Sequence, residues 1–496
     1  MSKLLDALAN WKPFTAVVIG DFMLDEMIYG NIDRLCNDAP VPVLHVQKTQ
    51  QQPGGAANVA LDLAAMHGQV RLVGVTGDDH DGAALRRLLE AAGVSAKGLV
   101  ADASRPTTAK KNLIGLAQHR HAQKMLRLDY ESTATICDAV TEAVLAAFAK
   151  ALDGADVVCL EDYNKGVCSE RICRGVIAQA RAKGVPVLVD PGALTDFSKY
   201  AGCATMTPNR SEAMRGTGMK VADDAPAEAF GELASRLMNS LGMEAAVITL
   251  DKQGALLLER EGEPRAVPTH ARRIYDVAGA GDMVLAALAA ARANGLDWFE
   301  SVRFANFAAG LEVEEFGCVP IPLARIHADV LARERATKGK LRTWDELKVE
   351  LAAVRSRSGG KAKVVFANGC FDVLHAGHVS LLRRAAALGD YLVVAINDDA
   401  SVRKLKGPTR PVYGVEDRAT LLGELECVGA VVVFGQDTPE ELVHVVEPDV
   451  LVKGAQYEVD KIPGAKFVQD RGGRVELLDV VPGRSTTNTV GKIRGG

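Results

Sequence analysis

The stretch "FANGCFDVLHAGHVSLLRRAAALGD", residues 366–390, joins a short apolar run to a helical pattern through a glycine-containing turn. The apolar run that ends near Asn368 predicts a buried strand, and the amphipathic residues after Gly377 predict a helix. His375 and His378 fall at the turn between the two elements. We therefore expect both histidines over the carboxyl end of a parallel sheet, where ligands bind in open α/β folds.

The two histidines permit three interpretations. A metal site needs a third and a fourth ligand at suitable spacing, and the nearest Asp, Glu and Cys residues do not form such a set. A core position is possible for a single histidine, but Gly377 lies between this pair and allows the backbone to approach a ligand closely. The start of the helix also offers free N–H groups to an anion. Binding of a phosphate fits the stretch best.

Residues 368–378, "NGCFDVLHAGH", resemble the H-x-G-H signature of the nucleotidyltransferase family that includes the glycerol-phosphate and choline-phosphate cytidylyltransferases. The resemblance implies that His375 and His378 stabilise charge on the α-phosphate of a nucleoside triphosphate while pyrophosphate leaves. It also makes the rest of the signature a candidate for nucleotide binding: Asn368, Gly369, Cys370, Phe371, Asp372 and Gly377.

Three later stretches add to this resemblance: "KLKGPTRPVYGVEDR" at 404–418, "LVKGAQY" at 451–457 and "GRSTTNTVGKI" at 483–493. Taken singly, each stretch can be a solvated surface or a helix cap. Together, in this order, they predict nucleotide binding by the last quarter of the chain. The side chains they offer are Lys404, Lys406, Arg410, Arg418, Lys453, Ser485, Thr486 and Thr487.

The periodicity of the chain predicts two α/β domains. In residues 1–330, short β-branched runs alternate with alanine-rich amphipathic stretches, which is the pattern of a parallel sheet covered by helices. Residues 33–46 and 107–128 alternate polar and apolar side chains and predict a small antiparallel β lid. Residues 331–360 are charged and end in Ser and Gly, which predicts a helical connector. Residues 361–496 form the second doubly wound domain.

A second motif lies in the front domain: the stretch "YDVAGAGDMVLAALAA" at residues 275–290 joins a glycine-containing turn to a helical pattern. Gly279, Ala280 and Gly281 can turn tightly and aim backbone N–H groups at a phosphate, with Asp282 at the start of a helix. Locally, Asp282 can also be a helix N-cap. The stretch resembles the second signature of the ribokinase-like carbohydrate kinases, which implies that Asp282 accepts the proton of a sugar hydroxyl beside an anion hole.

Other residues match the same kinase family between residue 1 and about residue 320. The resemblance implies sugar binding by Asp21, Gly54, Gly55, Asn58, Asn164 and Lys165, with Lys110 and Arg127 of the lid as candidates for holding an anionic group of the substrate. It implies that an N-x-x-E pattern holds nucleotide phosphates and, through Glu212, Mg²⁺: Asn209, Arg210, Ser211 and Glu212. The same four residues fit a helix capping box equally well.

Some positions depart from the kinase pattern. Ala278 stands where the family usually has Thr, Cys36 and Asn37 stand where relatives tend to have Ser and Pro, and Asn112 stands where heptose kinases often have Arg. None of these departures touches Asp282 or the glycines. They bear on the identity of the sugar.

The whole chain, in motif order and length, resembles the family of bifunctional enzymes that join a heptose 7-phosphate kinase to a heptose 1-phosphate adenylyltransferase. The fold implied is a ribokinase-like doubly wound sheet with its lid, followed by a Rossmann-like nucleotidyltransferase domain. The resemblance implies synthesis of ADP-heptose for the lipopolysaccharide core, with Mg²⁺ and ATP, heptose phosphates as substrates, no tightly bound organic cofactor, and a homodimer formed through the lid.

Composition limits the alternatives. The formal net charge of −5 gives no basic field for nucleic acid or an anionic membrane, no apolar run is long enough to span a membrane, and the start is too polar for a signal peptide. Nine cysteines without framework spacing are expected to be free thiols, so a cytoplasmic protein is expected. Two rivals remain at this point: a kinase fused to a polyol-phosphate cytidylyltransferase, and a front domain that senses sugar without phosphorylating it. Asp282 argues against the sensor, because a sensor needs no base.

Overall fold

The computed structural model describes residues 3–116, 123–222, 225–269, 275–315, 317–357, 361–455 and 457–479. The chain forms two compact units, residues 11–326 and residues 1–10 together with 327–496. None of the helices in these described ranges is long and apolar enough to cross a membrane. The predicted candidates Ser485, Thr486 and Thr487 lie outside the described residues.

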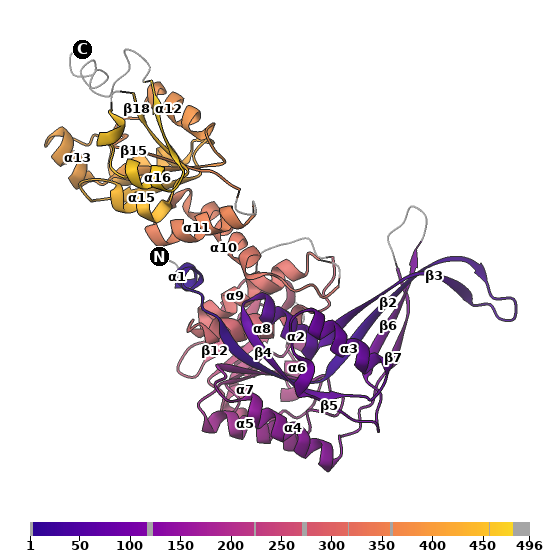
Figure 1. Ribbon diagram of the computed structural model, residues 1–496. Helices are drawn as coiled ribbons and strands as arrows, with labels where there is room; N and C mark the ends of the chain where they lie inside the picture. The colour runs from indigo at the N-terminus through magenta and orange to yellow at the C-terminus, as the bar shows by residue number, and fades with distance from the viewer. Residues whose placement is uncertain are drawn as a thin grey trace. The chain divides into compact units, whose positions relative to one another are not determined.

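The unit of residues 11–326 is built on a six-stranded parallel sheet with the order β10-β9-β8-β1-β4-β5 (Figure 1). Its strands are β1 (Phe14–Gly20), β4 (Gly68–Thr76), β5 (Leu99–Ala101), β8 (Val157–Glu161), β9 (Val187–Asp190) and β10 (Thr205–Met206). The apolar runs predicted as strands lie in these elements. Because the strand order reverses at β1, a crevice is expected beside the carboxyl ends of β1 and β8.

Helices cover this sheet, and a small antiparallel sheet extends the fold. The helices are α2 (Ala56–Ala65), α3 (His80–Ala91), α4 (Asp138–Ala151), α5 (Glu170–Ala182), α6 (Arg210–Thr217), α7 (Gly231–Leu241), α8 (Ala280–Ala293) and α9 (Trp298–Glu312). The small sheet contains β11 (Ala245–Thr249), β12 (Ala255–Glu259) and β13 (Arg265–Val267). Helix α8 is buried on all sides from Asp282 to Ala291, which its nearly unbroken Ala/Leu composition explains.

The lid is a four-stranded sheet that projects from this unit (Figure 1), with the order β3-β2-β6-β7. Its strands are β2 (Phe22–Leu35), β3 (Pro42–Gly55), β6 (Thr108–Leu116) and β7 (Gln123–Tyr130). The outer pairs are antiparallel, as predicted, but β2 and β6 run parallel. Alternation of polar and apolar residues gives a strand its two faces and not its direction, so the sequence could not reveal the parallel central pair.

The unit that contains residues 327–496 has a six-stranded parallel sheet with the order β14-β17-β16-β15-β18-β19. The strands are β14 (Leu341–Arg342), β15 (Val364–Gly369), β16 (Tyr391–Asn397), β17 (Ala430–Phe434), β18 (Val450–Gly454) and β19 (Arg474–Leu478). The helices are α10 (Leu323–Lys338), α11 (Trp344–Arg357), α12 (Ala376–Ala386), α13 (Asp399–Lys406), α14 (Val415–Gly423), α15 (Glu440–Val446) and α16 (Ala465–Asp470). The order reverses between β15 and β18, which places a second crevice there.

The segment 331–360, predicted to be a connector, belongs largely to this second unit. Strand β14 pairs with β17 at the edge of the sheet, and Leu347 and Leu351 of α11 enter the core. Arg342 Nε donates to Glu350 Oε2 at 2.6 Å in a pair that is almost fully buried. A two-residue edge strand is too short to give a periodic pattern. The charged composition of the segment also favoured a connector, so this packing could not be predicted from the sequence.

The first helix, α1 (Lys3–Ala9), packs against α11 and so belongs with the unit of residues 327–496. Its three leucines, Leu4, Leu5 and Leu8, are buried. Deleting residues 1–10 should therefore lower the free energy of unfolding of that unit by roughly 5 kcal/mol, since each buried Leu contributes about 1.5–3 kcal/mol. Hydrogen exchange of β15 and β16 in the full chain and in the deletion variant measures the effect.

Ala9→Ser, an exposed change in the same helix, is the matched control and should leave that exchange unaltered. Equal protection of β15 and β16 in the deletion variant and in the full chain would show that α1 contributes nothing to this unit.

Two candidate active sites

Asp282 lies in the first turn of α8, whose N-cap Gly279 has a φ of 86°. A Cβ at Gly279 would lie 2.6 Å from Glu312 Oε1, so both the backbone angle and the space require glycine. Asp282 accepts hydrogen bonds from Tyr163 Oη at 2.8 Å and from Asn58 Nδ2 at 3.0 Å. Burial raises the pKa of Asp282 to about 6, while these two bonds lower it. The group is therefore ionised at neutral pH and strong enough to act as a base.

Asp21 follows β1 and faces the loop after β8. Its Oδ2 accepts the backbone N–H groups of Tyr163 at 2.9 Å and Lys165 at 3.0 Å. Its Oδ1 is buried and has no hydrogen-bond partner among the described residues. Burial, and then the charge of Asp162, raise the pKa of Asp21 to about 6. Because Oδ1 has no partner in the described part of the chain, it is available to accept a hydrogen bond from a sugar hydroxyl.

The predicted G-G-x-x-N stretch lies where β3 meets α2. Gly55 has a φ of 56°, and a Cβ there would lie 2.7 Å from the carbonyl oxygen of Asp21. The backbone N–H of Ala56 donates to that carbonyl at 3.2 Å. A Cβ at Gly54 would lie 2.5 Å from Asp25 Oδ2. This close contact of backbones brings Asn58, one turn along α2, to Asp282.

The basic candidates of the front domain differ in their surroundings. Lys110 Nζ lies 4.8 Å from the centre of the Tyr163 ring, and its charge lowers the pKa of Asp282, so it lies at the site. Lys165 Nζ forms an ion pair with Glu131 at 2.7 Å. Arg127 Nε pairs with Asp129 at 2.8 Å, with more than half of its side chain exposed. Asn164 takes a φ of 56° in the same loop as Lys165.

The N-x-x-E pattern forms a capping box at α6. Asn209 Oδ1 accepts the N–H of Glu212 at 3.0 Å, and Glu212 Oε2 accepts the N–H of Asn209 at 2.9 Å. Arg210 lies over the Phe230 ring and donates to Gln253, which gives it a structural role. Ser211 is exposed. The capping box does not exclude phosphate binding, because the N-terminus of α6 keeps its partial positive charge.

Two further carboxyls lie close to the base, the buried Glu161 and the half-buried Asp190. Oxygens of Glu161, Asp190 and Asp282 lie within 4.8 Å of one another. Burial raises the pKa of Asp190 to about 8, so this carboxyl takes up a proton at neutral pH. A divalent cation brought in with nucleotide phosphates can replace that proton. Glu161 and Asp190 therefore suit Mg²⁺.

A cavity of about 260 Å³ lies between β13 and α9. Its lining mixes apolar, aromatic and amide groups: Val267, Pro268, Thr269, Phe299, Arg303, Asn306 and Phe307. Asn306 Nδ2 donates to the carbonyl of Val267 at 2.9 Å. A flat heteroaromatic ring fits such a lining. Its lining residues belong to no recognisable motif, so this cavity could not be predicted from the sequence.

In the second unit, His375 is the N-cap of α12 and its ring stacks on that of His378, with 3.8 Å between centroids and 17° between planes. The Phe371 ring meets His378 edge-on, with 5.2 Å between centroids. Burial, and then repulsion from His375, lower the pKa of His378 to about 4. His378 is therefore neutral at pH 7 before a phosphate arrives, which permits the close stacking.

Strands β15 and β18 lie side by side, so the C-terminal ends of both meet at this site. Lys453 Nζ donates to the carbonyl of Asn368 at 3.5 Å and lies over the Tyr457 ring. Burial lowers the pKa of Lys453 to about 8. No carboxylate of the described residues pairs with this half-buried ammonium, which suits it to an incoming phosphate.

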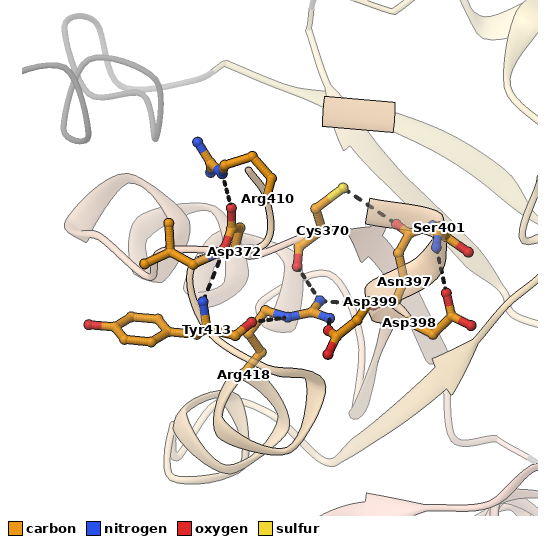
Figure 2. A network of polar contacts seen from close by, with 10 residues as sticks. Cys370, Asp372, Asn397, Asp398, Asp399, Ser401, Arg410, Tyr413 and Arg418 are labelled. Atoms are coloured by element: carbon orange, nitrogen blue, oxygen red, sulfur yellow. Dashed lines mark hydrogen bonds and ion pairs between the residues drawn. The ribbon is translucent and has the colours of Figure 1, made fainter. Parts of the chain in front are cut away.

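Figure 2 shows a network of polar contacts around Arg418, which reaches Cys370 of the stretch that leads to the histidine pair. The buried Arg418 guanidinium donates to the carbonyls of Cys370 at 2.7 Å and Asn397 at 2.8 Å, and to Asp399 Oδ1 at 2.6 Å. Arg418 thus joins the loops that follow β15 and β16, and its guanidinium is enclosed by protein. Direct phosphate contact, predicted for Arg418, would break these bonds.

Asp372, another predicted nucleotide-binding residue, also holds a loop in Figure 2. Its carboxylate pairs with Arg410 and accepts the N–H of Val412 at 2.5 Å. Cys370 Sγ donates to Asn397 Oδ1 at 3.7 Å, and Lys406 lies exposed at the end of α13. The contacts of Asp372 place it in support of the site.

Comparisons with known proteins match both parts of the chain. A model of the pfkB family carbohydrate kinases matches residues 15–324, and a cytidylyltransferase-like model matches residues 366–476. The bifunctional protein HldE of Syntrophotalea carbinolica is 41% identical over 487 residues, which cover 98% of this chain and 97% of that protein. The HldE protein of Caulobacter vibrioides is 43% identical over 98% of this chain and 99% of its own length. This chain belongs to the HldE family.

This chain is therefore an enzyme that joins a carbohydrate kinase to a nucleotidyltransferase, which confirms the family and enzyme classes predicted from its motifs. Phosphofructokinase-2 of Escherichia coli aligns with it at a TM-score of 0.52 and 17% identity, covering 64% of this chain and 97% of that one. At this identity the likeness shows the fold alone, and it agrees with the fold class predicted for the first unit.

Sequence reasoning missed several residues of the kinase site in this HldE chain. Tyr163, which donates to Asp282, lies beside the predicted Asn164, but a tyrosine after a strand carries no signal of its own. Glu161 and Asp190 are the last residues of β8 and β9, and no sequence motif distinguishes them from other acidic residues at strand ends. Their convergence with Asp282 depends on sheet order, which a single sequence does not specify.

The lowered pKa of Lys453 predicts that the nucleotidyltransferase activity of this chain falls at basic pH, which gives its pH profile a basic limb. Above about pH 8 the ammonium loses its proton and its charge, so kcat/KM for the nucleotide should fall as pH rises. Lys453→Arg should move the fall to higher pH, because the guanidinium stays charged. Initial rates of pyrophosphate release between pH 6.5 and 10 measure both profiles.

Lys461→Arg is the matched control, since Lys461 is an exposed lysine paired with Glu458. It should leave the profile unchanged. A basic limb that stays in place in Lys453→Arg would assign that limb to another group.

Proposed function

We propose that this HldE chain phosphorylates heptose 7-phosphate at O1 with ATP and, in its second unit, joins AMP from ATP to heptose 1-phosphate, releasing pyrophosphate. The observation that carries the first reaction is the buried Asp282, fixed by Asn58 and Tyr163 on the glycine turn of a carbohydrate kinase. The stacked His375–His378 pair, together with Lys453 on the neighbouring strand β18, carries the second.

In the kinase reaction, Asp282 takes the proton of the O1 hydroxyl as the oxygen attacks the γ-phosphorus of ATP, and ADP leaves. The backbone N–H groups of residues 279–281 lie at the start of α8, where they donate to the transferring phosphoryl group. Asp21 Oδ1 accepts a hydroxyl of the sugar and holds O1 in reach of the base.

In the transferase reaction, a phosphate oxygen of heptose 1-phosphate attacks the α-phosphorus of ATP and the bond to pyrophosphate breaks. His375 and His378 donate hydrogen bonds to the α-phosphate oxygens, where charge gathers in the transition state. Lys453 neutralises charge on the triphosphate. The N-terminus of α12 adds backbone N–H groups, and Arg418 and Asp372 keep the surrounding loops in place.

Mg²⁺ is the cation that the kinase reaction needs, because it neutralises the β- and γ-phosphates of ATP. Glu161 and Asp190 are the side chains suited to hold it, with Glu212 at the start of α6 acting through water. The cavity between β13 and α9 is proposed for the adenine ring. Lys110, with Lys165 and Arg127 released from their acidic partners, is proposed to hold the 7-phosphate.

Phosphorus NMR of the pure protein tests both reactions. With Mg²⁺, ATP and heptose 7-phosphate, a second phosphomonoester signal of the 1,7-bisphosphate should grow. With ATP and heptose 1-phosphate, a diphosphate-diester signal should appear together with pyrophosphate, and CTP in place of ATP should give none. Product with CTP alone would move the second unit to the cytidylyltransferases. Sugar binding without a new phosphomonoester would leave the front unit as a sensor.

We also propose that the lid pairs with the lid of a second copy. Strand β7 is exposed along its whole length and is an edge strand, and its apolar side chains Met125, Leu126, Leu128 and Tyr130 are exposed. An open, apolar edge of this kind invites pairing with another chain.

Leu126→Glu should convert a dimer to a monomer, because the charge would be buried without a partner in the interface. Light scattering at micromolar concentration measures the mass. Leu421→Glu, at an exposed leucine of α14, is the matched control and should leave the mass unchanged. A wild-type protein that is monomeric at this concentration would contradict the lid interface.

A further inference from the structure

The loop that follows β8, residues 162–168, supplies hydrogen bonds to two acidic residues of the kinase site. Tyr163 donates its backbone N–H to Asp21 Oδ2 at 2.9 Å and its hydroxyl to Asp282 Oδ1 at 2.8 Å. Lys165 donates a second backbone N–H to the same Asp21 oxygen at 3.0 Å. The orientation of Asp21 and Asp282 therefore depends on the path that this loop takes.

The loop turns through a local hydrogen bond and two residues in left-handed conformations. Asp162 Oδ1 accepts the N–H of Asn164 at 2.6 Å, which closes a turn at the start of the loop. Asn164 and Gly166 have φ values of 56° and 86°. A left-handed conformation costs free energy in a residue other than glycine and persists only where the surrounding contacts hold it. The loop therefore needs contacts from outside it to keep this path.

Lys199, in the short 3₁₀ helix Ser198–Tyr200, contacts both ends of this loop. Its Nζ donates to Asp162 Oδ2 at 2.5 Å and to the carbonyl of Cys168 at 2.8 Å. The Asp162 side chain is 1% exposed and that of Lys199 is 16% exposed. Burial lowers the pKa of Lys199, but the charge and the hydrogen bond of Asp162 raise it by more, so the ammonium keeps its charge. Tyr200 Oη donates to the same carboxylate oxygen at 2.6 Å, at the first end of the loop.

We propose that Lys199 is a positioning residue of the kinase, which joins the two ends of the loop 162–168 and thereby holds Asp21 in the orientation that binds the sugar. One ammonium bridges the first and the last residue of the loop, so the backbone N–H groups between them keep their direction toward Asp21 Oδ2. The other oxygen, Oδ1, then stays directed at the sugar hydroxyl. This role rests on the proposed function, in which Asp21 binds the sugar.

Hydrogen exchange of the full chain without substrate tests the loop directly. Lys199→Met keeps the length of the side chain and removes its donors, so the amides of Tyr163 and Lys165 should exchange about tenfold faster than in the wild type. Lys199→Arg should keep most of the protection, because a guanidinium can donate to a carboxylate and to a carbonyl at the same time. Lys183→Met, at an exposed lysine paired with Asp153, is the matched control and should leave the loop unchanged.

Strand β1 reports in the same experiment whether the unit stays folded. Its amides should exchange at the wild-type rate in Lys199→Met, so that the faster exchange is confined to the loop. Faster exchange throughout β1 as well would mean that Lys199 stabilises the whole unit, and it would overturn the positioning role. Unchanged exchange of the loop in Lys199→Met would overturn it too.

Kinetics test whether Lys199 acts through Asp21. Lys199→Met should raise KM for the sugar about tenfold and leave KM for ATP unchanged, because the loop serves the sugar end of the site. Lys199→Arg should restore most of the wild-type KM. In an Asp21→Asn background, Lys199→Met should raise KM by less than about threefold, since two residues that act through one contact are not additive. A full tenfold effect in that background would overturn the proposal. A wild-type chain that phosphorylates no sugar would refute the proposed function, and the exchange of the loop would still decide on Lys199.

Discussion

Asp282→Asn is expected to lower kcat of sugar phosphorylation by about 1,000-fold or more, since a positioned general base contributes typically 10²–10⁴-fold. The amide has the shape of the carboxylate but cannot accept the hydroxyl proton. It also meets two donors, because Tyr163 Oη and Asn58 Nδ2 both point at this side chain. Loss of the buried negative charge offsets the mismatch with these donors, so the free energy of unfolding should change little. Coupled detection of ADP at saturating sugar measures kcat.

AMP transfer by the same Asp282→Asn protein should stay at the wild-type rate, since that reaction belongs to the other unit. Asp153→Asn, at an exposed aspartate that pairs with Lys183, is the matched control and should keep both activities. Full sugar kinase activity in Asp282→Asn would refute the role of Asp282 as a base. It would also refute the interpretation of the glycine turn as an anion hole beside that base.

Much of the fold could be predicted because strand runs and glycine turns are local signals. The runs that became β1, β8, β15 and β18 are each apolar and β-branched, and each ends at a residue of a site. Strand direction in the lid could not be predicted, because the pairing of β2 with β6 is set by the chain's path between them. The assignment of α1 to the second unit could not be predicted either, because the sequence of a seven-residue helix does not specify that it packs against α11.

The sites divide in the same way. Asp282, Asn58 and Asp21 could be predicted because each belongs to a motif and each follows a strand or opens a helix. Arg418 was predicted to bind phosphate because a cation near a phosphate motif suggests contact. In the structure, three backbone carbonyls and Asp399 accept four of the five N–H donors of Arg418.

His378→Ala is expected to lower kcat of AMP transfer by about 100–1,000-fold, the usual cost of removing one donor to charge that develops in a transition state. The ring stacks on His375 and touches the edge of Phe371, so its removal also frees the neighbouring ring to move. KM for ATP should change less than kcat, because the hydrogen bond strengthens only as pyrophosphate leaves. Pyrophosphate release under saturating substrates measures the loss.

The matched control for His378→Ala is His444→Ala in the same unit. His444 packs on the Phe467 ring, with 3.9 Å between centroids, and belongs to α15, outside the H-x-G-H turn. Its loss should leave kcat of AMP transfer within about twofold, because packing changes outside a site rarely reach the transition state. Sugar phosphorylation should be normal in both variants. A small loss in His378→Ala with an equal loss in His444→Ala would mean that the histidine pair only packs the loop, and charge stabilisation would then fall to Lys453 and the start of α12.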